Sequence, residues 1–198
     1  MPYKSRWPVT IAMLTLALAL GSLARAEDIE PQFEDQSSTF DKQNQMRLEA
    51  SASLNAPLAK VYDALSNPDK VAKYDPQITA IKVVSTTPNS KVVEFTGQPI
   101  AVPNAPKSIQ IKFTFDPAKN AMTAQSVGKA LLKFRADYTL TASKDGKSTE
   151  IHFVNVSPDP SKALGMDTLP QFMRRDTALN TFMQNLRHAG QYIQAGGK

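Results

Sequence analysis

The sequence predicts an α+β domain in which a curved, seven-stranded antiparallel sheet wraps around one long C-terminal helix. Between residues 45 and 156, several short segments alternate apolar and polar side chains, the pattern of strands with one buried face. Short turns join most of these segments, which favours antiparallel pairing. Near the C-terminus, apolar side chains recur at helical spacing for about seven turns. Such a helix needs a large apolar surface, and the one-sided sheet supplies it.

The first 26 residues have the features of a cleaved secretory signal. Lys4 and Arg6 precede an apolar run at residues 9–20, and Ala24 and Ala26 form an A-x-A cleavage site. The run is shorter than the roughly 20 residues that a membrane-spanning helix needs. We therefore expect a bacterial protein that is periplasmic or secreted after cleavage behind Ala26, with an uncleaved N-terminal anchor as the alternative.

Residues 27–44 read as an acidic, flexible leader. They contain six acidic residues and one basic residue, and they show no sustained period. Residues 45–198 then form one domain. The chain contains no cysteine, so its core has to be held by packing without disulfides. The formal net charge is +5, but no run of basic residues is interleaved with aromatics, and we expect no nucleic-acid partner.

The elements of the domain follow in order. Residues 45–54 alternate strictly and predict the first strand. Two short helices follow, the first carrying an apolar stripe over residues 58–65 and the second beginning near Pro68. Asp145-Gly146 marks a hairpin between the last two strands, and Gly196-Gly197 ends the final helix, which starts near Leu169. The six remaining strands are predicted at residues 78–84, 91–96, 108–115, 122–127, 132–140 and 149–156.

The widths of these elements predict an internal cavity. One helix covers a strip roughly 10 Å wide. Seven strands at about 4.8 Å spacing span roughly 30 Å. The sheet therefore has to curl around the helix, and the space beneath it is difficult to fill. We expect an apolar ligand pocket between sheet and helix.

One stretch of the sequence resembles the START-like and polyketide cyclase (SRPBCC) helix-grip superfamily. The matching residues are Ala56-Pro57, then Val61-Tyr62-Asp63-Ala64-Leu65, then Asp75-Pro76 ahead of the second strand. The order of elements agrees over about residues 45–194. The superfamily includes lipid-transfer START domains, polyketide cyclases and coenzyme-Q-binding proteins. The resemblance implies a helix-grip fold that holds a lipid, sterol-like compound, quinone or polyketide between sheet and helix, without specifying which.

Five residues are candidates for ligand binding. Phe113 and Phe134 lie mid-sheet, and Phe172 and Met173 lie near the start of the long helix, where the superfamily's cavity opens. Tyr138 falls on the apolar face, so its hydroxyl needs a hydrogen-bond partner once it is buried. That partner is either the polar end of a ligand or, in an ordinary core, backbone or water.

Two long loops, at residues 97–108 and 157–170, are candidate gates. The first exposes Ile100 and Val102, and the second carries Leu164 and Met166. With nearby lysines, these apolar tips suit transient contact with an anionic membrane surface, although packed connecting loops explain them equally well. If they are gates, replacing Ile100 and Val102 with serine lowers ligand transfer between vesicles.

Chemical motifs are sparse. His152 and His188 both fall on polar positions, so we expect surface histidines, no metal site and no cofactor. No serine occupies a G-x-S-x-G elbow. The sequence therefore favours a monomeric, non-enzymatic carrier or sensor that binds a hydrophobic small molecule. A polyketide cyclase or dehydratase using the same cavity is the alternative, and a domain with a filled cavity that binds protein partners is the third.

Overall fold

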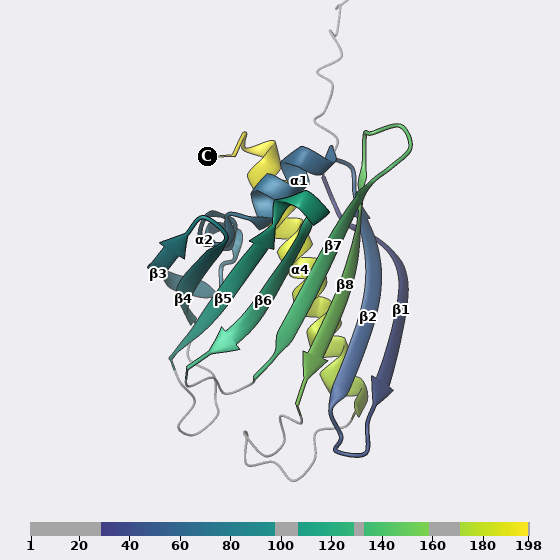
Figure 1. Cartoon of the computed structure of the whole chain (residues 1–198), viewed down its shortest axis with the longest axis vertical. Coiled ribbons are helices and arrows are strands. Elements are labelled where there is room, and N and C mark those ends of the chain that lie inside the picture. Colours follow the sequence, from purple (N-terminus) through teal and green to yellow (C-terminus); the bar gives the residue numbers. More distant parts are fainter. Residues whose placement is uncertain (1–28, 98–106, 129–132, 159–170, 198) are drawn as a thin grey trace, which may run out of the picture.

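Eight antiparallel strands form a single curved sheet in the order β1-β2-β8-β7-β6-β5-β4-β3 (Figure 1). The structure is a computed structural model that describes residues 29–97, 107–128, 133–158 and 171–197. The predicted signal peptide and the four predicted gate residues Ile100, Val102, Leu164 and Met166 lie outside the described residues. The strands are β1 (Gln32–Phe40), β2 (Met46–Leu54), β3 (Ile78–Thr87), β4 (Ser90–Gly97), β5 (Ser108–Asp116), β6 (Ala121–Val127), β7 (Arg135–Ala142) and β8 (Thr149–Ser157).

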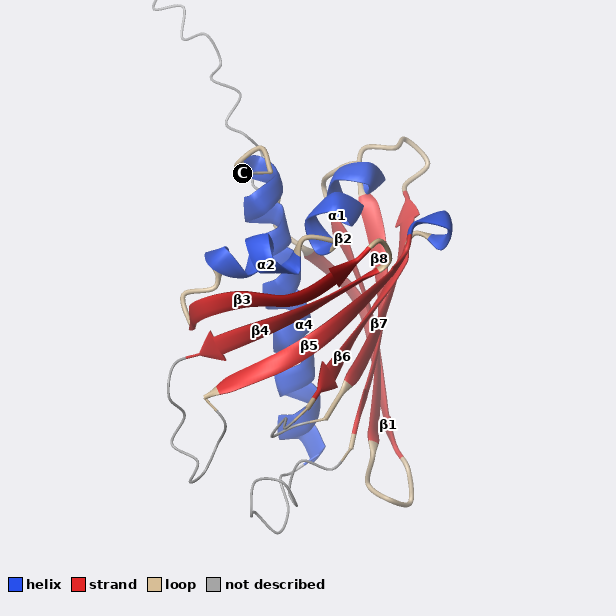
Figure 2. Cartoon of the chain, turned by 60° about the vertical axis from the view of Figure 1, so that its left-hand side comes forward, coloured by secondary structure: helices blue, strands red, loops and turns tan. Residues whose placement is uncertain are grey.

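The long helix α4 (Gln171–Gln194) runs along the concave face of the sheet (Figure 2). Two short helices follow β2, as expected: α1 (Leu58–Leu65) and α2 (Pro68–Val71), the latter continued by a single 3₁₀ turn, η1 (Ala72–Tyr74). These short elements pack against α4. A further 3₁₀ turn, η2 (Pro117–Lys119), connects β5 to β6. The α+β architecture with a sheet gripping a C-terminal helix is confirmed. No helix in the described part of the chain is both long and apolar enough to cross a membrane.

The sheet has one strand more than the sequence predicted. The segment interpreted as a flexible acidic leader contains β1, which pairs antiparallel with β2 from Gln32 to Phe40. Most of its side chains are exposed on both faces, so no apolar alternation betrays the strand. Backbone pairing with the edge of β2 holds it instead. The β1–β2 turn is supported by Asp41, whose Oδ1 accepts hydrogen bonds from the backbone N–H of Gln43 and Gln45 at 2.9 and 2.8 Å.

The residues just before β1 lie against α4. A Cβ added to Gly190 would collide with the backbone of Ile29, so the chain crosses the helix where only glycine leaves room. Next to this crossing, Arg187 Nε lies 3.0 Å from Glu30 Oε2. The pair is exposed and adds little stability by itself. The close backbone approach at Gly190 is therefore the feature that positions this segment on the helix.

The tightest packing lies between the C-terminal part of α4 and strands β2, β7 and β8. Phe182 and Leu186 on α4 are fully buried, and the Phe182 ring stacks on Phe153 of β8 with centroids 4.4 Å apart. On β2, five alternating residues point into this core, as the sequence predicted. They are Met46, Leu48, Ala50, Ala52 and Leu54.

Candidate functional site

The register of the strands sets one row of side chains across the middle of the concave face. Successive Cα partners run from β2 through β8, β7, β6 and β5 to β4. Because side chains directly opposite one another in a sheet share a face, these residues are neighbours. The row has small residues at its centre and larger ones at both ends. Its members are Leu48, Asn155, Ala136, Ala124, Phe113 and Lys91.

The adjacent row on the same face consists of Phe153, Tyr138 and Met122. Phe153 pairs with Tyr138, and Tyr138 pairs with Met122 on the next strand. The Tyr138 ring lies 5.1 Å from Phe153 and 6.2 Å from Phe182, centroid to centroid. This aromatic cluster fills the space between sheet and helix. Asn155 lies two residues after Phe153 on β8, and β8 runs toward the N-terminal end of α4 (Figure 1).

Asn155 is a buried polar residue on this face that the sequence interpretation did not single out. It lies on β8 at the same alternation as Ile151 and Phe153, facing the core, and is only 7% exposed. Its Oδ1 is buried and has no hydrogen-bond partner among the described residues. Buried polar atoms are nearly always paired, so an unpaired one points to a missing partner. The signal in the sequence was an amide at a position where the β8 pattern calls for an apolar side chain.

Beyond β6, the concave face is only partly covered. On β5, Ile109, Ile111 and Phe115 are half-buried, although they share the face of the buried Phe113. On α4, Leu179 and Met183 are half-buried as well. An ordinary core leaves few large apolar side chains in this state. These side chains provide an apolar surface that continues from the row of Asn155.

Tyr138 is buried, as predicted, and its hydroxyl already has a partner. The side chain of Asn185 on α4 hydrogen bonds to it, while burial raises the pKa of the tyrosine to about 12. The phenol therefore stays protonated at neutral pH and ties β7 to the helix. Of the two partners that the sequence left open, a ligand or the protein itself, the observed one belongs to the protein: it is the Asn185 side chain, where backbone or water was expected.

A partly buried ion pair ends the row at β4. Lys91 Nζ lies 2.7 Å from Asp69 Oδ1 on α2, with side-chain exposures of 15% and 22%. Lys91 follows the alternation of Val93 and Phe95, so its stem lies over the concave face. The contact joins α2 to the sheet and neutralises the charge that the lysine brings to this face.

The five predicted ligand-binding residues have different positions. Phe113 on β5 and Tyr138 on β7 are buried, and Phe134, which directly precedes β7, is half-buried and packs against the same core. Phe172 and Met173 lie in the first turn of α4, but their side chains are outside the described part of the structure. Three of the five thus share the predicted surface, and their ligand contact stays a prediction.

One histidine prediction was wrong. His152 is exposed, as expected, with Nδ1 3.4 Å from Ser51 Oγ. His188 is only 7% exposed, whereas the sequence placed it on the polar side of α4. It is covered because α1, α2 and η1 pack on a second side of the helix, which a stripe facing one sheet does not anticipate. Burial lowers the pKa of His188, the charge of Asp75 opposes this shift, and the charge of Arg187 adds to it.

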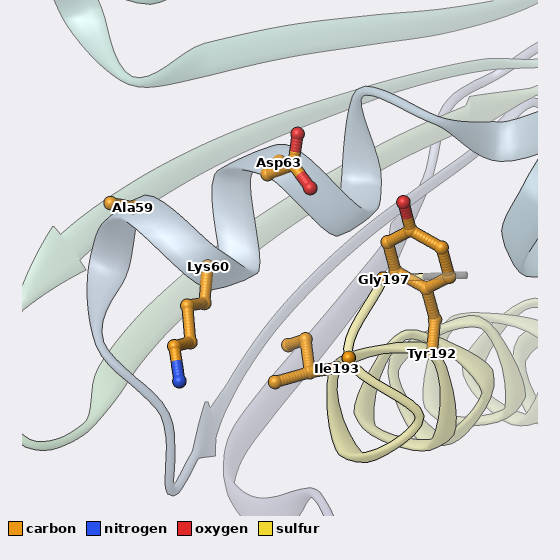
Figure 3. A pocket seen from close by; sticks show the side chains of 7 residues that line it. Ala59, Lys60, Asp63, Tyr192, Ile193 and Gly197 are labelled. Atoms are coloured by element: carbon orange, nitrogen blue, oxygen red, sulfur yellow. The ribbon is translucent and has the colours of Figure 1, made fainter.

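A pocket of about 450 Å³ opens elsewhere, between α1 and the end of α4 (Figure 3). Lys60 and Asp63 on α1 are exposed at its rim, and Tyr192 and Ile193 lie on the opposite side. It is a surface hollow outside the predicted space between sheet and helix. The described residues contain no group of three or more histidine, aspartate or glutamate side chains arranged to hold a metal ion.

Comparisons with known proteins agree with this geometry. Residues 45–190 match the family described as polyketide cyclase / dehydrase and lipid transport. The aromatase/cyclase Zhui from Streptomyces sp. R1128 has a similar structure, with a TM-score of 0.58, 13% identity and coverage of 77% of this chain and 98% of that one. Ara h 8.0201 is similar with a TM-score of 0.56, 17% identity and coverage of 76% and 99%.

A third similar structure is the protein TTHA0849 from Thermus thermophilus, with a TM-score of 0.53, 12% identity and coverage of 77% and 99%. At these identities the structures show a common fold and nothing finer. No curated protein matches the sequence.

Proposed function

The chain belongs to the polyketide cyclase, dehydrase and lipid transport family, and from that premise we propose that it is an exported carrier of a hydrophobic small molecule. The ligand, a lipid, sterol-like compound or quinone, lies between the concave face of the sheet and α4. The observation that carries this proposal is that large apolar side chains remain half-buried both on β5, at Ile109 and Ile111, and on α4, at Leu179 and Met183. When an apolar ligand covers apolar surface that the fold leaves partly exposed, the free energy of the complex falls because that surface is removed from water.

The way the sheet is covered supports this assignment. The helix makes its main sheet contact with β2, at one side of the concave face. Ile109 and Ile111 lie on β5, and three strands, β8, β7 and β6, separate β5 from β2 in the sheet. A single helix covers about 10 Å of width, so a ligand is the natural cover for the remainder.

Binding is favoured over catalysis because the ionisable groups on the described concave face are already engaged. Tyr138 is protonated and bonded to Asn185, and Lys91 is paired with Asp69. General acid–base catalysis needs a group that can exchange a proton near the working pH. The cyclase or dehydratase alternative requires such a group, and turnover of a polyketide-like substrate would establish it.

Export is the second part of the proposal. It rests on the signal-like segment at residues 1–26 and on a cysteine-free domain stabilised by its core. In the aqueous space outside the inner membrane, a hydrophobic molecule needs a carrier to move between membranes. N-terminal sequencing of the mature protein from the periplasmic fraction tests this directly, and a mature chain that starts at Glu27 is expected.

The ligand is tested by mass spectrometry of organic extracts from protein purified from its native compartment. Recovery of one hydrophobic class at a constant ratio to protein is expected, and an empty protein would contradict the carrier function. Leu179→Trp should reduce the bound fraction several-fold because the larger ring fills the proposed site. Asn180→Trp is the matched control, since the neighbouring position is exposed and binding should persist.

A further inference from the structure

We propose that Asn155 is the polar anchor of the ligand site and accepts a hydrogen bond from a hydroxyl group of the ligand. The inference rests on the proposed function and specifies its ligand: an apolar molecule with one uncharged hydroxyl. Asn155 is 7% exposed, and its Oδ1 is buried without a partner among the described residues. An acceptor left in this state destabilises the empty protein. A ligand that supplies a donor removes that cost on binding.

The neighbours of Asn155 on the sheet offer no donor to its Oδ1. Directly opposite it are Leu48 on β2 and Ala136 on β7, neither of which has a polar side-chain atom. The diagonal neighbours are Tyr138 on β7 and Phe134, which directly precedes that strand, and the Tyr138 hydroxyl is bonded to Asn185. The concave face therefore surrounds one acceptor with apolar side chains.

The positions beside the amide in this row carry two small residues. Ala136 and Ala124 occupy the next two positions of the row, before the larger Phe113. Because an alanine side chain ends at Cβ, the surface of the strip between Asn155 and Phe113 is lower than the surface formed by the larger side chains on either side. A ring or acyl chain lying on this strip would bring a terminal hydroxyl to Oδ1 while its apolar body covers the half-buried Ile111 and Leu179.

The chemistry of the site favours an uncharged hydroxyl over a charged head group as the matching partner. An ionised carboxylate or phosphate diester offers only acceptors, so it could bond Nδ2 of Asn155 but would leave Oδ1 unpaired. Lys91, the cation at the β4 end of this row, is neutralised by Asp69 at 2.7 Å. Burying an unpaired charge here would cost far more than a hydroxyl hydrogen bond returns.

The test uses two probes that differ in one donor, 2-naphthol and 2-methoxynaphthalene. The affinity of the purified full-length protein for each is measured by displacement of a fluorescent apolar dye. The ratio of the two affinities should favour 2-naphthol by about ten-fold more in the native protein than in Asn155→Leu, because a buried acceptor discriminates strongly against a ligand without the donor. Asn180→Leu makes the same change at an exposed position of α4 and should keep the native ratio.

The outcomes separate this inference from the function on which it rests. Equal ratios in the native protein and Asn155→Leu would overturn the anchor while the carrier function stands. Failure of both probes to bind would count against the carrier function itself. Asn155→Leu should also melt at a higher temperature without ligand, because it removes the unpaired acceptor. A lower melting temperature with an unchanged ratio would assign Asn155 a purely structural role, and Asn155→Val repeats the test if the leucine variant does not fold.

Discussion

The two sides of the concave face are packed in different ways. On the side of β2, β8 and β7, α4 packs Phe182 and Leu186 against the sheet, and both are fully buried. On the side of β5, Ile109 and Ile111 are half-buried, and so are Leu179 and Met183 on the helix. Both sides are apolar, so composition does not separate them. The difference is how much of each side the helix covers.

We interpret the closed side of this face as the part that stabilises the fold and the half-buried side as the part that binds ligand. Fully buried aromatic contacts such as the stack of Phe153 on Phe182 hold the helix to the sheet. Half-buried apolar side chains contribute less to stability, because they lose less contact with water on folding. They remain available to a ligand. Asn155 lies on β8 within the closed side, and its buried Oδ1 has no hydrogen-bond partner among the described residues.

The largest expected effect tests this division with two neighbouring residues. Phe182→Ala should lower the free energy of unfolding by about 3–5 kcal/mol, because it leaves a cavity in the closed side. Met183→Ala, one residue further along, should cost only about 1 kcal/mol, because the side chain is half-buried. Urea denaturation followed by circular dichroism measures both. Equal losses would show that the two sides are packed alike.

Tyr138→Phe should have a smaller effect. The change removes the hydroxyl bonded to Asn185 and leaves the ring in its cluster, so the loss should be about 1 kcal/mol. Ligand affinity should hardly change, because the hydroxyl is engaged with the helix. Calorimetric melting and dye displacement on the same preparation check both statements. A large loss of affinity with native stability would instead make Tyr138 a ligand contact, as the sequence left open.

His188 should produce the smallest effect, visible only as a pH dependence. Burial holds its pKa in the folded state below the ordinary value of about 6.5. The unfolded chain therefore takes up a proton first as the pH falls, and the folded state loses stability between about pH 6.5 and the lowered pKa. His188→Gln should remove this loss, so its stability relative to the native protein should rise on acidification.

The matched control for that measurement is His152→Gln, which alters an exposed histidine on β8. Its stability should follow the native protein across the same pH range. If His188→Gln also follows the native protein, then the burial of His188 does not affect its protonation.

Patterns of burial explain why most of the fold was accessible from the sequence. β2 alternates over its whole length because one face is dry and the other wet, and the observed strand, Met46–Leu54, lies within the predicted 45–54. β1 was missed because an edge strand outside the core exposes both faces and leaves no such alternation. His188 was misplaced because α1, α2 and η1 cover a second side of α4, and that packing joins segments over a hundred residues apart.

The candidate site divides in the same way. Periodicity alone placed Phe113, Phe134 and Tyr138 on the apolar face, and the structure puts all three there. Asn155 escaped notice because a single polar residue at an apolar position has no meaning until its neighbours are known. Only the register, which sets Asn155 between Leu48 and Ala136, shows that its oxygen has no partner.

The sequence by itself determined the class of the fold, the long helix and the apolar face of the sheet, because local periodicity records which side of each element is buried. The tertiary structure decided how much of that face the helix covers, that β1 forms the edge of the sheet beside β2, and which polar groups have hydrogen-bond partners. These depend on contacts between distant segments, and no periodicity within one element encodes them.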